Sequence, residues 1–240
     1  MLELYYYLNS TCSQKVKLCL AEKKLEWTGR HVSLPDFEQL KPNYLQLNPN
    51  GVVPTLVHDG RPVLESTMIN EYLDDVFPEV DLRPKDPYEL ARLRAWSKHV
   101  DDVVHPAVRV PTFAKWAGRE AKKRSEEELE AITCRMPSKE AAERWRKSAK
   151  GEIGEDEVAA AVEKLEKTLA RMETMLAEGP YLLGEFSLAD VNTFPYILRM
   201  EHLFLADAWK EKPKVRAWMD RMKARPSFKE MFSLKQEPWA

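Results

Sequence analysis

The sequence has few cysteines and no long apolar run. Its 240 residues include Cys12, Cys19 and Cys134, an odd number at spacings that fit neither a disulfide framework nor a zinc site. We therefore expect reduced thiols and no metal. No apolar stretch approaches the roughly 18 residues of a membrane span, and the start lacks the pattern of a signal peptide. These absences predict a cytoplasmic protein without a membrane partner.

The chain also lacks a large excess of charge of either sign. There are 37 Lys and Arg against 39 Asp and Glu, a net charge of −2, and the basic run at 122–124 is followed directly by Ser125 and three glutamates. This pattern is not typical of nucleic-acid binding, so we expect no nucleic-acid partner. The 44% of apolar residues is enough for one large domain or two small ones.

The first third of the chain alternates between strand-like and helix-like patterns, which indicates an α/β unit. Strands are expected at 2–8 and 27–34, with a helix between them that begins near Cys12 and turns Lys15 and Lys17 to solvent. An irregular stretch follows to Asn50. Asp59-Gly60 then separates two β-rich runs and predicts an antiparallel hairpin, because Gly60 tolerates positive φ. The next helix has Ser66 as its candidate N-cap.

Strand patterns end at a proline-rich linker, 79–87. The rest of the chain is helical: helices are expected at 88–104, at 158–176 and from Ser187, whose hydroxyl forms a capping box with Asp190. The charged segment at about 119–157 is interpreted as solvated helices joined by loops. The predicted fold class is therefore α/β plus all-α, in two domains at 1–78 and 88–240.

Four small polar residues occupy the first strand-to-helix turn: Ser10, Thr11, Cys12 and Ser13. The free N–H groups and the positive end of the helix dipole favour an anion there. A hydroxyl that donates to a bound thiolate would add to this effect and lower the pKa of the thiol. Alternatively, one of these residues only caps the helix and the others have no role.

Two further features suit a small peptide. The Val53-Pro54 bond can be cis at low cost, which would turn the backbone of Val53 outward to pair with an extended peptide. Glu65 and Ser66 precede a helix and suit the ammonium and carboxylate of an α-amino acid, although Ser66 could be a plain N-cap. A thiol site, a peptide edge and an amino-acid clamp together point to a thiol peptide, for which glutathione is the natural candidate.

The segments STCSQKVKL, NPNGVVPTL, DGRPVLEST and GEFSLADVN resemble the cytosolic glutathione transferases over nearly the whole chain, and the turn is most similar to the zeta and theta classes. The resemblance implies a thioredoxin-like domain, a helical domain, glutathione as co-substrate and a homodimer. It makes Ser10 the leading activator of the thiol, with Cys12 or Ser13 in reserve.

The same resemblance assigns the glutathione contacts. Val53, next to Pro54, would pair with the glutathione cysteine, Glu65 and Ser66 would bind the γ-glutamyl group, and Gln39 would contact the glycyl end. Gly51 and Val52 replace the basic and amide residues common in the zeta class. The contact to the glycyl carboxylate is therefore left open.

A narrower likeness lies in the second domain. MPSKEAAERWRKSAKG and ARPSFKEMF resemble the bacterial glutathione-dependent β-aryl etherases, in which the serine lies closer to Ser13. A pocket over the thiol, walled by the first helix of the second domain, would take an aromatic electrophile. The candidate lining residues are Trp96, His99, Val103, Phe113 and Trp116, which alternatively form plain core; His99 and His105 could assist proton transfer.

We therefore expect a glutathione transferase whose bound thiolate attacks a hydrophobic, aromatic electrophile, as in the cleavage of a β-aryl ether. Two alternatives stay open. One is a thiol–disulfide oxidoreductase or reductive dehalogenase that uses Cys12 as nucleophile. The other is a non-catalytic binding module on the same fold.

Overall fold

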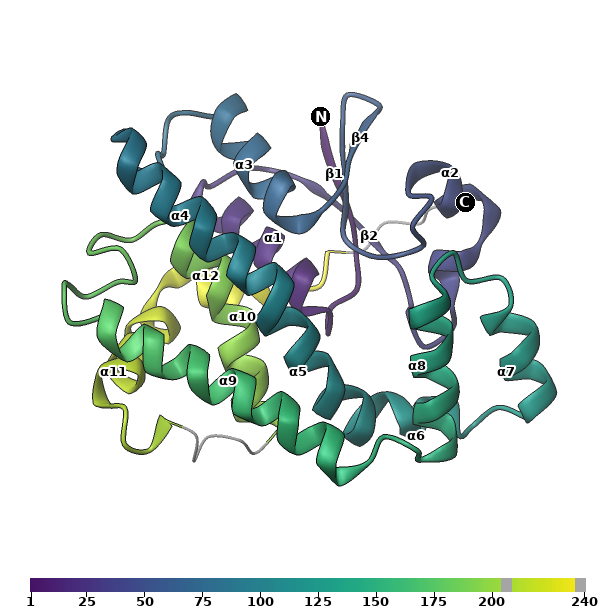
Figure 1. Cartoon of the computed structure of the whole chain (residues 1–240). Helices are drawn as coiled ribbons and strands as arrows, with labels where there is room; N and C mark the ends of the chain where they lie inside the picture. The colour runs from purple at the N-terminus through teal and green to yellow at the C-terminus, as the bar shows by residue number, and fades with distance from the viewer. Residues whose placement is uncertain (204–208, 236–240) are drawn as a thin grey trace.

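A mixed sheet forms the N-terminal part of the chain in the computed structural model, which describes residues 1–203 and 209–235 (Figure 1). Its strands are β1 (Leu2–Tyr6), β2 (Thr28–His31), β3 (Thr55–His58) and β4 (Arg61–Val63), in the order β2-β1-β3-β4. β1 runs parallel to β2, so the chain must cross over between them, and α1 (Thr11–Glu22) makes that crossover.

The hairpin between β3 and β4 is antiparallel, as predicted. Asp59 and Gly60 have φ values of 50° and 79°, the pair of positive angles that a two-residue hairpin turn favours. The stretch to Asn50 contains a 3₁₀ turn, η1 (Glu38–Leu40), and a short helix, α2 (Pro42–Leu47). Helix α3 (Ser66–Val76) begins at Ser66 itself, so Glu65 occupies the N-cap position and the predicted cap was one residue late.

The remainder of the described chain is helical. Its elements are α4 (Pro87–His99), the π-helical turn η2 (Val100–Val104), α5 (His105–Thr112), the π-helical turn η3 (Phe113–Ala117), α6 (Gly118–Ala121), α7 (Glu126–Thr133), α8 (Lys139–Lys150), α9 (Glu155–Met175), α10 (Leu188–His202), α11 (Pro213–Ala224) and α12 (Pro226–Met231). Over residues 1–203 and 209–235, none of these helices has the length and apolarity of a membrane span.

Helix α1 is covered on both sides, by the sheet and by α3, α10 and α12 (Figure 1). All residues from 13 to 20 are buried. The expectation that Lys15 and Lys17 face solvent is therefore wrong. Each long side chain instead reaches an acceptor outside the helix: Lys15 Nζ lies 2.9 Å from Asp101 Oδ1, and Lys17 Nζ donates to the carbonyl of Ser233. Buried ammonium groups need such partners.

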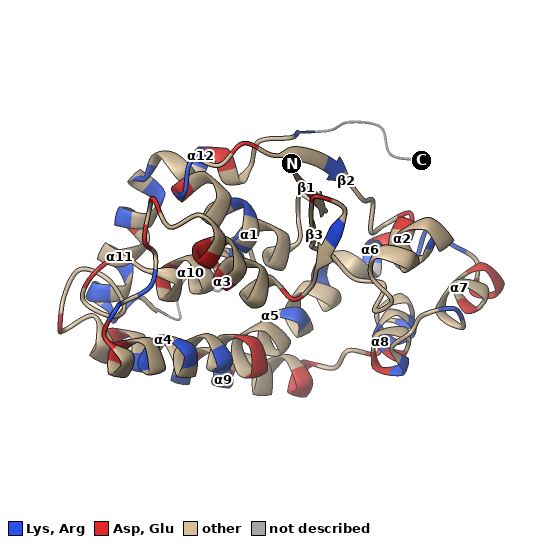
Figure 2. Ribbon diagram, turned by 90° about the horizontal axis from the view of Figure 1, so that it is seen from above, with Lys and Arg blue, Asp and Glu red and all other residues tan. Residues whose placement is uncertain are grey.

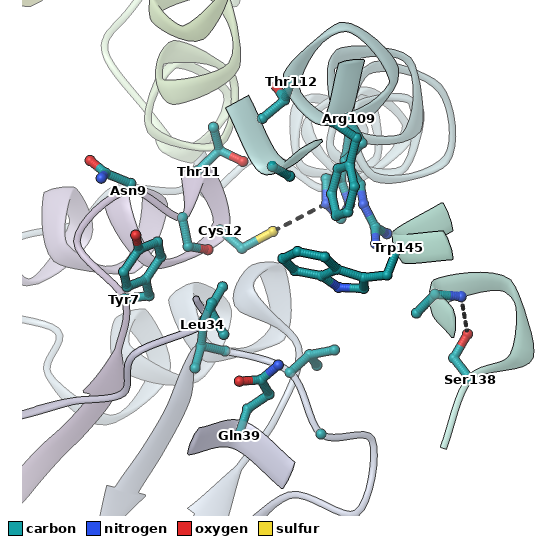
Figure 3. Close-up of a pocket in the computed structure, with 18 of the residues that line it drawn as sticks. Tyr7, Asn9, Thr11, Cys12, Leu34, Gln39, Arg109, Thr112, Ser138 and Trp145 are labelled. Atoms are coloured by element: carbon teal, nitrogen blue, oxygen red, sulfur yellow. Dashed lines mark hydrogen bonds between the residues drawn. The ribbon is translucent and has the colours of Figure 1, made fainter. Parts of the chain in front are cut away.

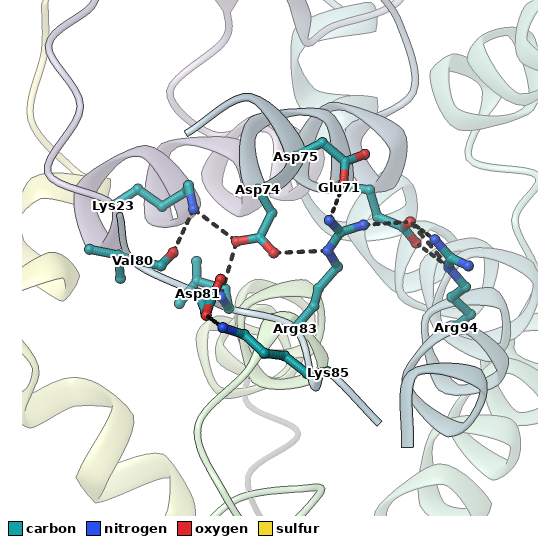
Figure 4. A network of polar contacts seen from close by, with 10 residues as sticks. Lys23, Glu71, Asp74, Asp75, Val80, Asp81, Arg83, Lys85 and Arg94 are labelled. Atoms are coloured by element: carbon teal, nitrogen blue, oxygen red, sulfur yellow. Dashed lines mark hydrogen bonds and ion pairs between the residues drawn. The ribbon is translucent and has the colours of Figure 1, made fainter. Parts of the chain in front are cut away.

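The connection between the domains is fixed by buried charge (Figure 4). Asp74 of α3 accepts hydrogen bonds from Lys23 Nζ at 2.8 Å, from the Leu82 N–H at 3.0 Å and from Arg83 Nε at 2.8 Å. Lys23 also donates to the carbonyl of Val80 at 2.6 Å. The linker is thereby held against α1 and α3, which sets where α4 begins. Asp86 caps α4 by accepting from the next two free N–H groups.

The capping box predicted at the start of α10 is confirmed. The Ser187 N–H donates to Asp190 at 3.1 Å, and Asp190 also accepts from the Leu182 N–H at 3.1 Å and from Trp218 Nε1 at 2.7 Å. Asp190 is fully buried, and burial raises its pKa to about 6 in spite of these donors. One carboxylate thus joins α10 to α11 and to the loop before it.

The charged insertion, at about residues 119–157, also has an apolar face that packs against the first domain. Its apolar side chains form a cluster with Phe37 and Leu40 of the first domain, and the rings of Phe37 and Trp145 lie 4.9 Å apart. The rest of that cluster consists of Leu129, Ile132, Met136 and Ala149. Figure 2 shows acidic residues on α7 and residues of both signs on α8. The interpretation as solvated helices missed the apolar face, which joins the insertion to the first domain.

We expect Asp190→Ala to lower the free energy of unfolding by about 3 kcal/mol or more, because three donors lose their acceptor inside the core at about 1–3 kcal/mol each. Glu128→Ala removes the acceptor of the exposed capping box at Ser125 and should cost no more than about 1 kcal/mol. Urea denaturation of the two variants measures both losses. Equal losses would contradict the role given to Asp190.

Candidate functional site

A cavity of about 720 Å³ lies between the two domains, where the N-terminus of α1 faces α5 (Figure 3). The first domain lines it with the β1–α1 turn, the segment 50–54 and the start of α3. The second domain contributes α5, η3, the start of α8 and one side chain of α10. Every peptide-binding feature predicted from the sequence opens into this one space.

Ser10 is the N-cap of α1 and also faces the cavity. Its Oγ accepts the N–H of Ser13 at 3.3 Å, which leaves its own O–H available to donate. The N–H groups of Thr11 and Cys12 belong to the first helical turn and have no acceptor within the helix. Ser10 can therefore cap the helix and donate a hydrogen bond to an anion at the same time.

Ser13 does not line the cavity. It is fully buried, and its Oγ accepts the N–H of Tyr7 at 3.3 Å. Ser13 therefore holds the turn against the end of β1, on the inner side of the helix.

Cys12 lies beside the cavity with two polar partners. Its Sγ is 3.6 Å from His105 Nε2 and 3.4 Å from Tyr196 Oη. Burial by itself would raise the pKa of this thiol, but the charges of His105 and Lys15 and the hydrogen bonds of His105 and Tyr196 lower it to about 6. Cys12 therefore ionises more readily than an ordinary thiol.

The predicted peptide-binding residues come together on the first-domain side. The Val53-Pro54 bond is cis. The carbonyl of Val52 accepts from Tyr44 Oη at 2.6 Å and from Asn48 Nδ2 at 2.8 Å, which fixes the segment before that bond.

The other two predicted contacts are polar groups at the cavity wall. Gln39 is buried, and its Oε1 has no hydrogen-bond partner within the described chain. Glu65 has a φ of 65°, rare for a residue with a side chain, and presents an exposed carboxylate next to buried Ser66. Such an unpartnered amide and such a strained position are common where a ligand is bound.

Phe113 and Trp116 line the opposite wall, but three predicted residues do not. Trp96 donates Nε1 to Thr193 Oγ1 at 2.8 Å inside the second domain, and His99 Nε2 lies 3.0 Å from Thr168 Oγ1. Val103 lies in η2, just before α5, whose first residue, His105, lines the cavity. A π-helical turn holds more residues than an α-helical one, so η2 changes which side chains point at the first domain.

Sequence reasoning missed several lining residues. Two of them, Arg109 and Thr112, recur at helical spacing with the predicted residues His105 and Trp116 along one stripe, a pattern that could have identified this face. Trp145 and Arg199 come from the insertion and from α10. No local pattern places them here, because the distant segments meet only in the folded chain.

We expect iodoacetamide to alkylate Cys12 at a rate that rises through a midpoint near pH 6, because the thiolate is the reactive form. The experiment uses the Cys134→Ser protein, since Cys134 is exposed, while Cys19 is buried with a raised pKa. His105→Asn should move the midpoint up by about one pH unit or more. A midpoint that stays in the ordinary range of a free thiol would contradict the assignment; mass spectrometry identifies the modified residue.

Comparison with known proteins gives two family matches. The model described as glutathione S-transferase, N-terminal domain, matches residues 9–76, and the model of the C-terminal domain matches residues 155–221. Protein LigF from Sphingobium sp. strain SYK-6 is 37% identical over 239 residues, with 96% of this chain and 93% of that protein covered. The tetrachloro-p-hydroquinone reductive dehalogenase of Sphingobium chlorophenolicum is 31% identical over 242 residues, with 94% and 93% covered.

Solved structures with a similar fold include members of the same family. The crystal structure of β-etherase LigF from Sphingobium sp. strain SYK-6 matches with a TM-score of 0.90 at 36% identity, covering 96% of this chain and 98% of that one. A glutathione transferase homologue from Sulfitobacter, with bound glutathione, matches with a TM-score of 0.68 at 25% identity, covering 95% and 94%. The predicted thioredoxin-like and helical domains and the prediction of a glutathione-dependent enzyme are thereby confirmed, and the chain belongs to the glutathione S-transferase family.

Proposed function

We propose that this enzyme cleaves a β-aryl ether, or a closely related aromatic electrophile, by attack of the glutathione thiolate. The observation that carries this proposal is that the first turn of α1 opens directly into an aromatic pocket: Ser10 and Thr11 share one cavity with Phe113, Trp116 and Trp145. The similarity to β-etherase LigF over nearly the whole chain supports an ether as substrate.

The first-domain side of the cavity fits glutathione. The Glu65 carboxylate would accept the ammonium of the γ-glutamyl group, and the free N–H groups at the start of α3 would hold its carboxylate. The backbone of Val53 would pair with the cysteinyl residue beside Pro54. Gln39, whose amide oxygen lacks a partner within the described chain, would contact the glycyl end.

Ser10 would act as a hydrogen-bond donor to the sulfur. Because its Oγ already accepts from Ser13, the direction of the hydroxyl proton is restricted, and the dipole of α1 adds to the stabilisation of negative charge. As the S–C bond forms, the C–O bond breaks and its electron pair leaves on the phenolate oxygen. Phe113 and Trp116 would hold the aromatic ring in line for this displacement. His105 lines the same cavity and could return a proton to the product.

One observation supports a second candidate function, a thiol–disulfide reaction or reductive dehalogenation through Cys12. A thiolate with a pKa of about 6 beside the same turn could form a mixed disulfide with glutathione, and a reductive dehalogenase is among the similar proteins. The greater likeness to the etherase favours ether cleavage. Cys12→Ser decides between them: ether cleavage survives this change, whereas a reaction through a Cys12 disulfide is lost.

We expect glutathione-dependent release of a phenol from a β-aryl ether, measured by liquid chromatography. The panel also contains halogenated aromatics, an isomerisable diketone and a mixed disulfide. The ether should give the highest kcat/KM because the pocket has an aromatic wall and a thiolate-stabilising turn on facing sides. Failure to turn over any aryl electrophile would overturn the proposal.

Ser10→Ala should lower kcat/KM by about 100-fold and raise the pKa of enzyme-bound glutathione, because one donor to the thiolate is lost. Ser13→Ala is the matched control: its hydroxyl accepts from Tyr7, so the variant should lose stability but leave the thiol pKa in place. Ultraviolet titration of the thiolate in each complex gives the pKa. A shift in Ser13→Ala alone would transfer the role to Ser13.

The homodimer and the cytoplasmic location stay predictions. Exposed apolar side chains on α3 and α4 support an interface: Met68 is 51%, Val76 40% and Tyr88 72% exposed. Sedimentation velocity would detect a particle of twice the 27.9 kDa chain.

A further inference from the structure

The electrophile side of the cavity contains a cation that forms no ion pair with a carboxylate of the described chain. Arg109 of α5 is half-buried and lines the cavity, and Figure 3 shows its guanidinium extending toward Trp145, on the side where Cys12 lies. Within the described chain, no carboxylate forms an ion pair with it. A half-buried guanidinium normally gains a carboxylate or another acceptor.

Arg144 of α8 increases this excess of positive charge. The two guanidinium carbons lie 5.9 Å and 5.5 Å from the centre of the Phe113 ring. Arg144 pairs with Glu140 through one nitrogen, and its buried Nη1 has no partner within the described chain. Burial, and then the Arg144 charge, lower the pKa of Arg109 to about 10, so Arg109 stays charged at neutral pH.

A third guanidinium lies farther along the wall. Arg199 is 6% exposed, donates Nη2 to the Asn9 carbonyl at 2.5 Å and lies 4.9 Å from the centre of the Trp116 ring, while its Nε has no partner within the described chain. The nearby carboxylate that lines the cavity, Glu120, pairs with Lys123 at 2.7 Å. The charges of Cys12 and Glu140 act on Arg109 without forming an ion pair with it, so the aromatic end of the cavity carries guanidinium groups whose hydrogen-bonding capacity is not filled within the described chain.

We propose that the aromatic electrophile presents an oxyanion to this wall and that Arg109 is the residue that selects for it. The proposal rests on the transferase function proposed above and names its substrate class. A planar guanidinium suits a carboxylate or a phenolate, and Phe113 and Trp145 provide surfaces for the attached ring. The oxyanion has two possible sources: a carboxylate that the ring already carries, or the phenolate that receives the electron pair of the broken C–O bond.

The first source is tested with a matched pair of substrates, 4-chloro-3-nitrobenzoate and its methyl ester, each with glutathione. Arg109→Gln should lower kcat/KM for the carboxylate by about 10- to 100-fold, the range of a charge-assisted hydrogen bond, and change the ester less than twofold. Arg216→Gln, an exposed arginine on α11, is the control for loss of one charge and should change neither. An unchanged melting temperature of Arg109→Gln excludes a folding effect.

The second source is tested with β-aryl ethers whose phenols differ in acidity. If Arg109 stabilises the departing phenolate, Arg109→Gln should slow the ethers of the least acidic phenols most. An equal effect on acid and ester, together with an unchanged dependence on the leaving group, would overturn the proposal. Wild-type turnover of the ester keeps the transferase function intact in that case, whereas wild-type protein inactive on every substrate would defeat the function itself.

Discussion

The position of α1 determines the rest of the site. This helix is buried along residues 13–20 and packs against α3, α10 and α12. In the proposed reaction the first turn of α1 stabilises the glutathione sulfur, and this requires that the neighbouring helices keep the turn in a fixed position. The two lysines on the helix, Lys15 and Lys17, donate to acceptors from the second domain and from the C-terminal segment, so packing between the domains helps to hold the helix in place.

The two walls of the cavity differ in chemistry, and we propose that they bind different substrates. The first-domain wall offers backbone edges, a helix N-terminus and the Glu65 carboxylate, groups that match the repeating features of a peptide. The second-domain wall offers aromatic rings and guanidinium groups, which discriminate by shape and charge. In the proposed reaction, rate enhancement would come mainly from orientation and from stabilisation of negative charge at the sulfur and at the leaving oxygen.

Features controlled by neighbouring residues could be predicted from the sequence. The Asp59-Gly60 hairpin, the Ser187–Asp190 capping box and the Ser10 turn each depend on a few adjacent side chains, and the structure contains all three. Contacts between distant segments could not be predicted. Trp96 has the residue type of a pocket wall but faces Thr193, and Trp145 reaches the cavity from an insertion whose charge hid its apolar face. Exposure of Lys15 was misjudged for the same reason, since amphipathic spacing cannot show that a second layer will cover the polar side.

The wall that contains Trp145 comes mostly from one continuous stretch of the chain, residues 77–154. The two family matches end at residue 76 and resume at residue 155, and most of the second-domain residues that line the cavity lie between them. The residues that we propose bind glutathione all lie before this stretch. A change confined to this stretch would therefore alter which electrophiles the cavity admits while leaving the residues proposed to bind glutathione in place, which makes the stretch a natural unit to exchange when the substrate range is engineered.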